Sequence, residues 1–183
     1  MRLVGGEHVP TSGPFIVVAN HVDWKDPPAL EFTLRRAIRF MAKIEAFDLF
    51  FLGGVMRGIG CFPVRRGESD RRAIRTCLDV LAAGNPLGFF PEGTRSRDGR
   101  LRRAQPGVAF LARRSGAPIL PVGIVGTRGA RPFRARIEVR VGAPFRVTDL
   151  ATEERDEQAL ADAIMRRVAA LLPAEQRGVY AAD

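Results

Sequence analysis

Cysteine, lysine, tryptophan and tyrosine are scarce in this sequence of 183 residues, and it contains no long apolar run. The two cysteines, Cys61 and Cys77, form no Cys-x-x-Cys pair, so the sequence predicts neither a metal site nor a disulfide framework. No apolar run reaches the roughly 18 residues of a membrane-spanning helix, and no charged-then-apolar leader opens the chain. We therefore expect a protein of a reducing compartment that is soluble or peripheral to a membrane.

Positive charge exceeds negative charge, with a net charge of +9 and an isoelectric point near 11.1. Of the 29 basic residues only Lys25 and Lys43 are lysines, and the planar fork of arginine suits phosphate and carboxylate groups. Such a balance favours acidic lipid, phosphorylated substrate or nucleic acid as partners, although a compositional bias towards arginine and alanine explains the same numbers. Charge alone does not choose among them.

Nucleic acid is the partner with the least support. The chain has one tryptophan and one tyrosine, whereas single-stranded nucleic acid is commonly bound by stacking on aromatic rings. It has no RNA-recognition, zinc-finger or helix-turn-helix signature. We expect no nucleic-acid partner, and a basic module that binds anionic lipid or nucleic acid remains the non-enzymatic alternative.

The length fits one domain, and apolar β-branched runs alternate with helical patterns along it. Strands are predicted over residues 15–19, 38–42, 61–64, 87–90, 118–125 and 136–141. Helices are predicted over residues 26–35, 46–57, 106–114 and 153–172, and another after Ser69-Asp70 carries Ile74, Leu78 and Leu81. This order predicts an α/β fold, a single-domain sandwich with a mainly parallel or mixed β-sheet flanked by helices.

His21 follows the first predicted strand, in a polar loop that leads to Asp26-Pro27-Pro28. A neutral imidazole can take a proton from an alcohol when a carboxylate holds the correct tautomer, and Asp26 is a candidate for that carboxylate. An aspartate followed by prolines is also typical of a helix N-cap, and for an isolated pair the structural interpretation is the commoner one. Both interpretations stay open on these residues alone.

Three further blocks follow the first one, which is Asn20-His21-x-x-x-x-Asp26. They are Gly-Cys-Phe-Pro-Val-Arg-Arg at 60–66, Phe-Pro-Glu-Gly-Thr-Arg-Ser at 90–96 and Ala-Pro-Ile-Leu-Pro-Val at 117–122. In this order the four blocks closely resemble those of the glycerolipid acyltransferase family, of the 1-acyl-sn-glycerol-3-phosphate (lysophosphatidic acid) acyltransferase type. The block at 90–96 is the most specific of the four.

The resemblance implies one acyltransferase domain over residues 1–183, with a motif-bearing core at 2–147 and a C-terminal helix at 153–172. It implies that His21 is the general base and Asp26 its orienting partner, and that the acyl group passes directly from thioester to hydroxyl. The residues agree with this direct route, because the chain has no Gly-x-Ser-x-Gly elbow and Cys61 is interpreted as a small core residue.

The second and third blocks supply the substrate-binding candidates. Arg66 and Arg95 match the family positions assigned to the acceptor's phosphate, a task that suits a forked, permanently charged donor. Glu92 matches an acid that either binds glycerol hydroxyls or holds the Arg95 loop. Gly93 allows the backbone a close turn, and Thr94 completes the predicted substrate-binding set.

The resemblance further implies transfer of a fatty acyl chain from acyl-CoA or acyl carrier protein to a lysophosphatidate-like acceptor in phospholipid biosynthesis. No cofactor is implied beyond that co-substrate. The expected setting is cytoplasmic, on the cytoplasmic face of an anionic membrane. Another lysophospholipid, glycerol-3-phosphate or a glycolipid remain alternative acceptors, and a catalytically silent lipid-binding relative is disfavoured by the presence of both His21 and Asp26.

Two features fall outside the assigned pattern. Asp23 stands where the family commonly carries serine, and a second carboxylate beside the imidazole is expected to raise the imidazole pKa or to perturb Asp26. The apolar segment 47–56 fits a membrane contact or an acyl channel as well as it fits a helix buried against the sheet.

Overall fold

The computed structural model describes residues 1–44, 47, 54, 58, 60–64, 71–130, 136–150 and 156–181. In this part of the chain seven strands form one sheet in the order β1-β7-β6-β2-β5-β3-β4. They are β1 (Arg2–Val4), β2 (Ile16–Ala19), β3 (Arg39–Lys43), β4 (Phe62–Val64), β5 (Leu87–Phe89), β6 (Ile119–Val125) and β7 (Glu138–Val141). Neighbouring strands are parallel except β6 and β7, which are antiparallel. The predicted α/β class with a mainly parallel or mixed sheet is confirmed.

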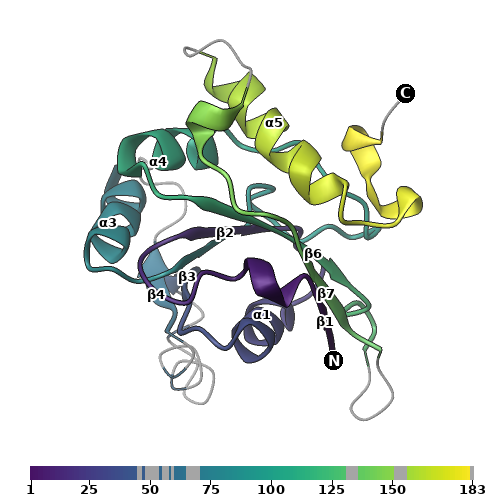
Figure 1. Ribbon diagram of the computed structural model, residues 1–183. Coiled ribbons are helices and arrows are strands. Elements are labelled where there is room, and N and C mark those ends of the chain that lie inside the picture. Colours follow the sequence, from purple (N-terminus) through teal and green to yellow (C-terminus); the bar gives the residue numbers. More distant parts are fainter. Residues whose placement is uncertain are drawn as a thin grey trace.

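Helices cover both faces of this sheet (Figure 1). They are α1 (Asp26–Leu34), α3 (Arg71–Ala82), α4 (Gly107–Ser115) and α5 (Glu157–Ala169). Figure 1 shows α1 on one face and α3, α4 and α5 on the other. Strand β2 alternates between the two cores: Ile16 and Val18 pack towards α4 and α5, whereas Val17 and Ala19 pack towards α1.

The structure departs from the predicted elements at both ends of the chain. The last helix begins at Glu157 and not at residue 153, because extended Asp156 caps it by accepting hydrogen bonds from the N–H groups of Gln158 and Ala159. Strand β1 was not predicted, and its three exposed residues carry no alternation that would indicate a strand. Of the predicted helix over 46–57 the structure describes only residues 47 and 54, and the predicted cap at 69–70 lies outside the described residues.

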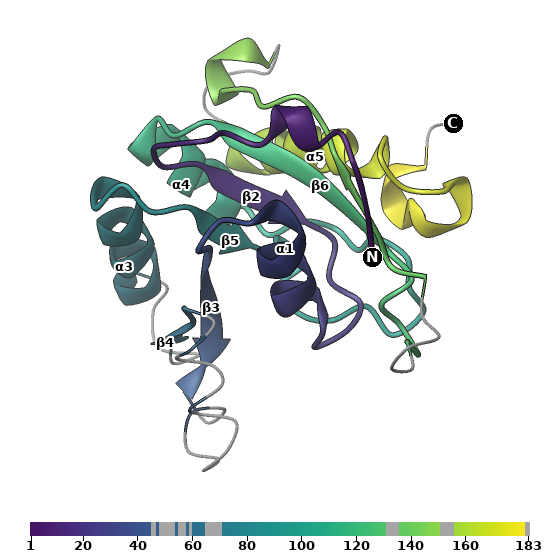
Figure 2. The same cartoon turned by 60° about the horizontal axis from the view of Figure 1, so that its bottom comes forward.

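The topology brings three loops to one edge of the sheet. Strand β2 pairs in parallel with both β5 and β6, so the segments that follow Ala19, Phe89 and Val125 emerge side by side (Figure 2). Open α/β sheets bind their ligands at this carboxyl edge. None of the helices in the described part of the chain is long and apolar enough to cross a membrane.

Candidate active site

His21 and Asp26 form a hydrogen bond at the carboxyl end of β2. The His21 Nδ1 atom lies 2.8 Å from Asp26 Oδ2, and this oxygen also accepts hydrogen bonds from the backbone N–H groups of Val22 (2.7 Å) and Asp23 (2.8 Å). Because a carboxylate oxygen accepts, the proton of a neutral imidazole belongs on Nδ1, and Nε2 is left with a free lone pair. The His21 side chain is 17% exposed while that of Asp26 is fully buried.

Asp26 is the first residue of α1 and not its N-cap, so the capping interpretation is wrong. Lys25 occupies the cap position without a side-chain hydrogen bond. An Asp26 cap would need donors further along the helix, but Pro28 has no N–H and the Ala29 N–H binds the Lys25 carbonyl. The carboxylate therefore turns back to the loop that carries His21, where the helix N-terminus favours its negative charge.

The block at 90–96 holds the backbone of His21 on both sides. The His21 N–H donates to Glu92 Oε1 at 2.8 Å, and the His21 carbonyl accepts from the Ser96 N–H at 2.7 Å. The Phe90 ring stacks on the imidazole, with 4.2 Å between centroids and 18° between planes. These contacts fix the position of the imidazole through both its main chain and its ring.

Glu92 is buried and joins two loops. Its second oxygen, Oε2, accepts a hydrogen bond from the Arg102 N–H at 3.0 Å. Burial raises the pKa of the Glu92 carboxyl to about 7, although the hydrogen bonds from His21 and Arg102 act in the opposite direction. These contacts tie the loop of His21 to the segment around Arg102, and the binding of glycerol hydroxyls by Glu92 stays a prediction.

The other predicted binding residues occupy the rim or lie outside the described residues. Gly93, Thr94 and Arg95 are exposed, and Gly93 has a φ of 68°, a conformation that suits glycine. Arg95 is close enough to the His21 loop for its charge to lower the pKa of Asp23. Arg66 lies outside the described residues.

Asp23 is held by Lys25, not by the imidazole. Its Oδ1 atom lies 3.0 Å from Lys25 Nζ and accepts the Lys25 N–H at 3.1 Å. Burial acts to raise the pKa of Asp23, but the Lys25 hydrogen bonds and the charges of Lys25 and Arg95 outweigh it, so the pKa is lowered. The extra carboxylate of the first block is thus neutralised locally.

Neither cysteine offers a nucleophile. Cys61 and Cys77 are buried and form no disulfide. Burial raises the pKa of the Cys61 thiol to about 11, which keeps it protonated near neutral pH. In the described ranges no group of three or more histidine, cysteine or acidic side chains is arranged to hold a metal ion.

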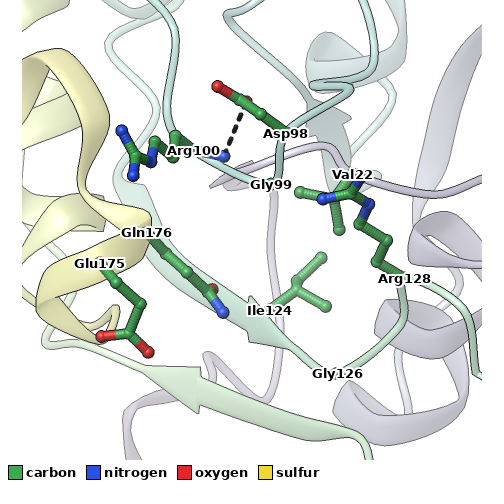
Figure 3. Close-up of a pocket in the computed structure, with 9 residues that line it drawn as sticks. All are labelled: Val22, Asp98, Gly99, Arg100, Ile124, Gly126, Arg128, Glu175 and Gln176. Carbon is green, nitrogen blue, oxygen red and sulfur yellow. Dashed lines mark hydrogen bonds between the residues drawn. The ribbon is translucent and has the colours of Figure 1, made fainter.

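A cavity of about 300 Å³ lies beside the His21 loop, between the ends of β2 and β6 (Figure 3). Val22 and Ile124 give it an apolar wall, and Arg100 and Arg128 line it with positive charge; Figure 3 shows the Arg128 side chain extending towards Val22. Its other lining residues are Asp98, Gly99, Gly126, Glu175 and Gln176. Sequence reasoning missed Arg128, which no motif distinguishes from the many other arginines.

A family model described as Acyltransferase matches residues 1–125. The chain belongs to this acyltransferase family. It is 31% identical to a 1-acyl-sn-glycerol-3-phosphate acyltransferase of Chlamydomonas reinhardtii, over 97% of this chain and 54% of that protein. It is 28% identical to the 1-acyl-sn-glycerol-3-phosphate acyltransferase of Bacillus subtilis, over 92% of this chain and 86% of that protein.

Two further similarities bear on this family membership. A lyso-ornithine lipid O-acyltransferase of Pseudomonas aeruginosa is 32% identical over 65% of this chain and 46% of that protein. The crystal structure of the 1-acyl-sn-glycerophosphate acyltransferase PlsC from Thermotoga maritima matches with a TM-score of 0.74 and 27% identity, over 93% of this chain and 71% of that chain. The chain spans about half the length of the Chlamydomonas relative. The resemblance to glycerolipid acyltransferases is confirmed.

Proposed function

We propose that this acyltransferase moves a fatty acyl chain from a thioester donor, acyl-CoA or acyl carrier protein, to the hydroxyl of a lysophosphatidate-like acceptor in phospholipid biosynthesis. The observation that carries the proposal is the hydrogen bond of 2.8 Å between His21 Nδ1 and buried Asp26. The names of the Chlamydomonas, Bacillus and Thermotoga relatives support this class of acceptor. The reaction belongs on the cytoplasmic face of an anionic membrane, where such an acceptor resides.

In the proposed reaction His21 acts as the general base. Its Nε2 atom takes the proton of the acceptor hydroxyl while the hydroxyl oxygen attacks the carbonyl carbon of the thioester. The new C–O bond forms, the C–S bond breaks, and the leaving sulfur takes the proton back from Nε2. Asp26 keeps the proton on Nδ1 and stabilises the transient imidazolium, and the products are an ester and a free thiol.

Arginines near His21 support an acceptor that carries phosphate. Arg95 lies at the rim of the site and Arg100 and Arg128 line the adjacent cavity. A guanidinium group binds a phosphate through paired hydrogen bonds and keeps its charge at all physiological pH values. Arg66 remains the other proposed phosphate ligand.

The test measures free thiol released from acyl-CoA, and then from acyl carrier protein, with a panel of acceptors. The panel contains lysophosphatidate, another lysophospholipid, glycerol-3-phosphate and, because of the Pseudomonas relative, a lyso-ornithine lipid. We expect lysophosphatidate to be the best acceptor. His21→Ala and Asp26→Asn should each lower kcat by roughly 10²- to 10⁴-fold, the usual contribution of base catalysis. Equal rates in the wild type and both variants would exclude the proposed mechanism.

A further inference from the structure

The outer side of α1 and of the turn before it carries an apolar stripe formed by Trp24, Pro28 and Phe32. Pro28 and Phe32 are spaced four apart and share one face of the helix, and Trp24 lies in the turn directly before the cap residue Lys25. Trp24 is 61% exposed and Phe32 is 72% exposed. The opposite side of the same helix is buried against the sheet through Leu30 and Leu34. Helix α1 is therefore apolar on both sides, and one of them has no partner within the described residues.

Exposed apolar side chains also gather beside this stripe. Strand β1 lies next to α1, and the Sδ atom of Met1, which is 63% exposed, lies 3.7 Å from Thr33 Oγ1. Leu3 and Val4 of β1 are exposed as well. Scattered single apolar residues are common on protein surfaces, but neighbouring ones mark an interaction surface.

The charge around the stripe favours an anionic partner. The Lys25 ammonium group lies 5.6 Å from the centroid of the Trp24 ring, and exposed Arg35 follows the end of the helix. Asp23 offsets the charge of Lys25, with which it is paired, so the positive charge that favours an anionic partner comes from Arg35 and from the net charge of +9 of the whole chain. Aromatic rings flanked by basic groups are typical of surfaces that enter the headgroup region of a bilayer.

We propose that the stripe of Trp24, Pro28 and Phe32 docks this acyltransferase on an anionic lipid bilayer. The inference rests on the proposed function, whose acceptor and product are both lipids. Trp24 is three residues from His21, and Asp26 begins the helix that carries Phe32. Docking through this side of α1 brings the catalytic loop to the headgroups, so that the acceptor reaches His21 without leaving the lipid.

Trp24 is the only tryptophan of the chain, so its fluorescence reports directly on the proposed docking surface. Vesicles of an equal mixture of phosphatidylglycerol and phosphatidylcholine are titrated into the protein, in parallel with vesicles of phosphatidylcholine alone. We expect co-sedimentation with the anionic vesicles, a blue shift of the Trp24 emission, and quenching of that emission by lipids brominated on their acyl chains. Failure to bind anionic vesicles, or binding with unchanged Trp24 emission, would overturn the proposal.

A matched pair of variants locates the docking surface. Phe32→Ser should weaken partition into anionic vesicles by roughly tenfold, the loss expected when one aromatic ring no longer leaves water. Phe110→Ser is the control, since Phe110 is 46% exposed on α4 and lies on the other face of the sheet. Equal weakening by the two substitutions would show that the stripe is not the docking surface.

Activity separates this inference from the proposed function on which it rests. With a short-chain acceptor dissolved as monomers, Phe32→Ser should release thiol at the wild-type rate. With a long-chain acceptor embedded in vesicles, its rate should fall in step with its partition. An equal fall with both acceptors would count against docking. If none of the acceptors in the panel makes the wild type release thiol, the proposed function fails. Vesicle binding needs no substrate, so it still decides the docking question.

Discussion

The two ends of the parallel strands differ in what they hold. At the amino ends of β2 and β6, near Pro14 and Pro118, lies a cavity of about 590 Å³, which is larger than the cavity of about 300 Å³ beside His21. Its polar lining consists of Arg114, Ser115 and Arg146, with no carboxylate or histidine among the described residues that line it. The smaller cavity is lined by Val22, which follows His21 in the chain, and so lies beside the loop in which His21 contacts Asp26 and Glu92. Volume therefore does not mark the site, whereas the convergence of chemical groups does.

The reason for this difference lies in the chain direction. At the carboxyl end β2 passes within a few residues into the N-terminus of α1, and the intervening loop presents the backbone N–H groups of Val22 and Asp23 to Asp26. Backbone N–H groups and the positive end of a helix stabilise a buried carboxylate. At the amino end α4 finishes at Ser115 and Gly116 follows in a left-handed conformation, so carbonyl groups are presented there instead. The carboxyl end suits a carboxylate, and the amino end does not.

The largest effect on stability is expected at Glu92. Its pKa is raised from 4.5 to about 7 in the folded protein, so its contribution to stability is fully present below about pH 4.5 and is lost as the pH rises towards 7. The shift corresponds to about 3 kcal/mol. The glutamine of Glu92→Gln cannot ionise. Between about pH 4.5 and 7 the unfolding free energy of the wild type should therefore fall by about 3 kcal/mol more than that of the variant. Urea unfolding at a series of pH values measures the difference.

The same substitution should also lower the activity at all pH values. Glutamine has one acceptor oxygen, so it can serve the N–H of His21 or that of Arg102 but not both. We expect Glu92→Gln to lower kcat, because the His21 backbone is then less firmly held. Parallel stability profiles for wild type and variant would contradict the assignment of a raised pKa to Glu92.

A smaller effect is expected at Gly88, which lies in β5 and touches no reacting group. A Cβ atom on Gly88 would lie 2.0 Å from Cε1 of buried Phe40. The Phe40 ring stacks on Phe90 with 5.8 Å between centroids, and Phe90 stacks on His21. Gly88→Ala should therefore destabilise the fold by about 2 kcal/mol and lower kcat, because it displaces the imidazole through two rings. Thermal unfolding and thiol release measure the two effects.

Gly107→Ala is the control for that substitution. Its Cβ would meet Phe89 at 3.9 Å, an ordinary contact, and Gly107 is the first residue of α4. We expect unchanged activity and stability equal to or slightly above that of the wild type, since alanine favours helices. Wild-type kcat in Gly88→Ala would show that the ring stack does not position His21.

The sequence predicted the architecture and the pairing of His21 with Asp26 because both have local signals. Apolar runs and helix spacing marked the strands and helices of the core, and the four blocks marked His21, Asp26 and Glu92. The strand β1 was missed because its exposed residues carry no such pattern. Of the two interpretations left open for Asp26, the capping one is wrong, because local preference takes no account of the missing N–H of Pro28 and of the three donors in the preceding loop.

The contacts that hold the site could not be predicted, because they join residues far apart in sequence. Phe40, Phe90 and His21 belong to three segments, and only the strand order brings their rings together. The same holds for Asn20, whose side chain accepts the N–H of Ile124 and donates to its carbonyl, and so ties the end of β2 to β6. Such pairs follow from the topology, which single-sequence patterns leave open.

The smallest effects are expected from the matched arginines Arg95 and Arg114. Both are exposed, but Arg95 is near the His21 loop whereas Arg114 lines the cavity at the amino ends of the strands. Arg95→Ala should raise the KM for lysophosphatidate by roughly tenfold, the loss of one charge-assisted hydrogen bond to phosphate, with kcat little changed. Arg114→Ala should change neither constant by more than about twofold. If Arg114→Ala raised the KM as much as Arg95→Ala, net charge alone would attract the phosphate. Specific phosphate binding at the carboxyl ends of the strands would then be excluded.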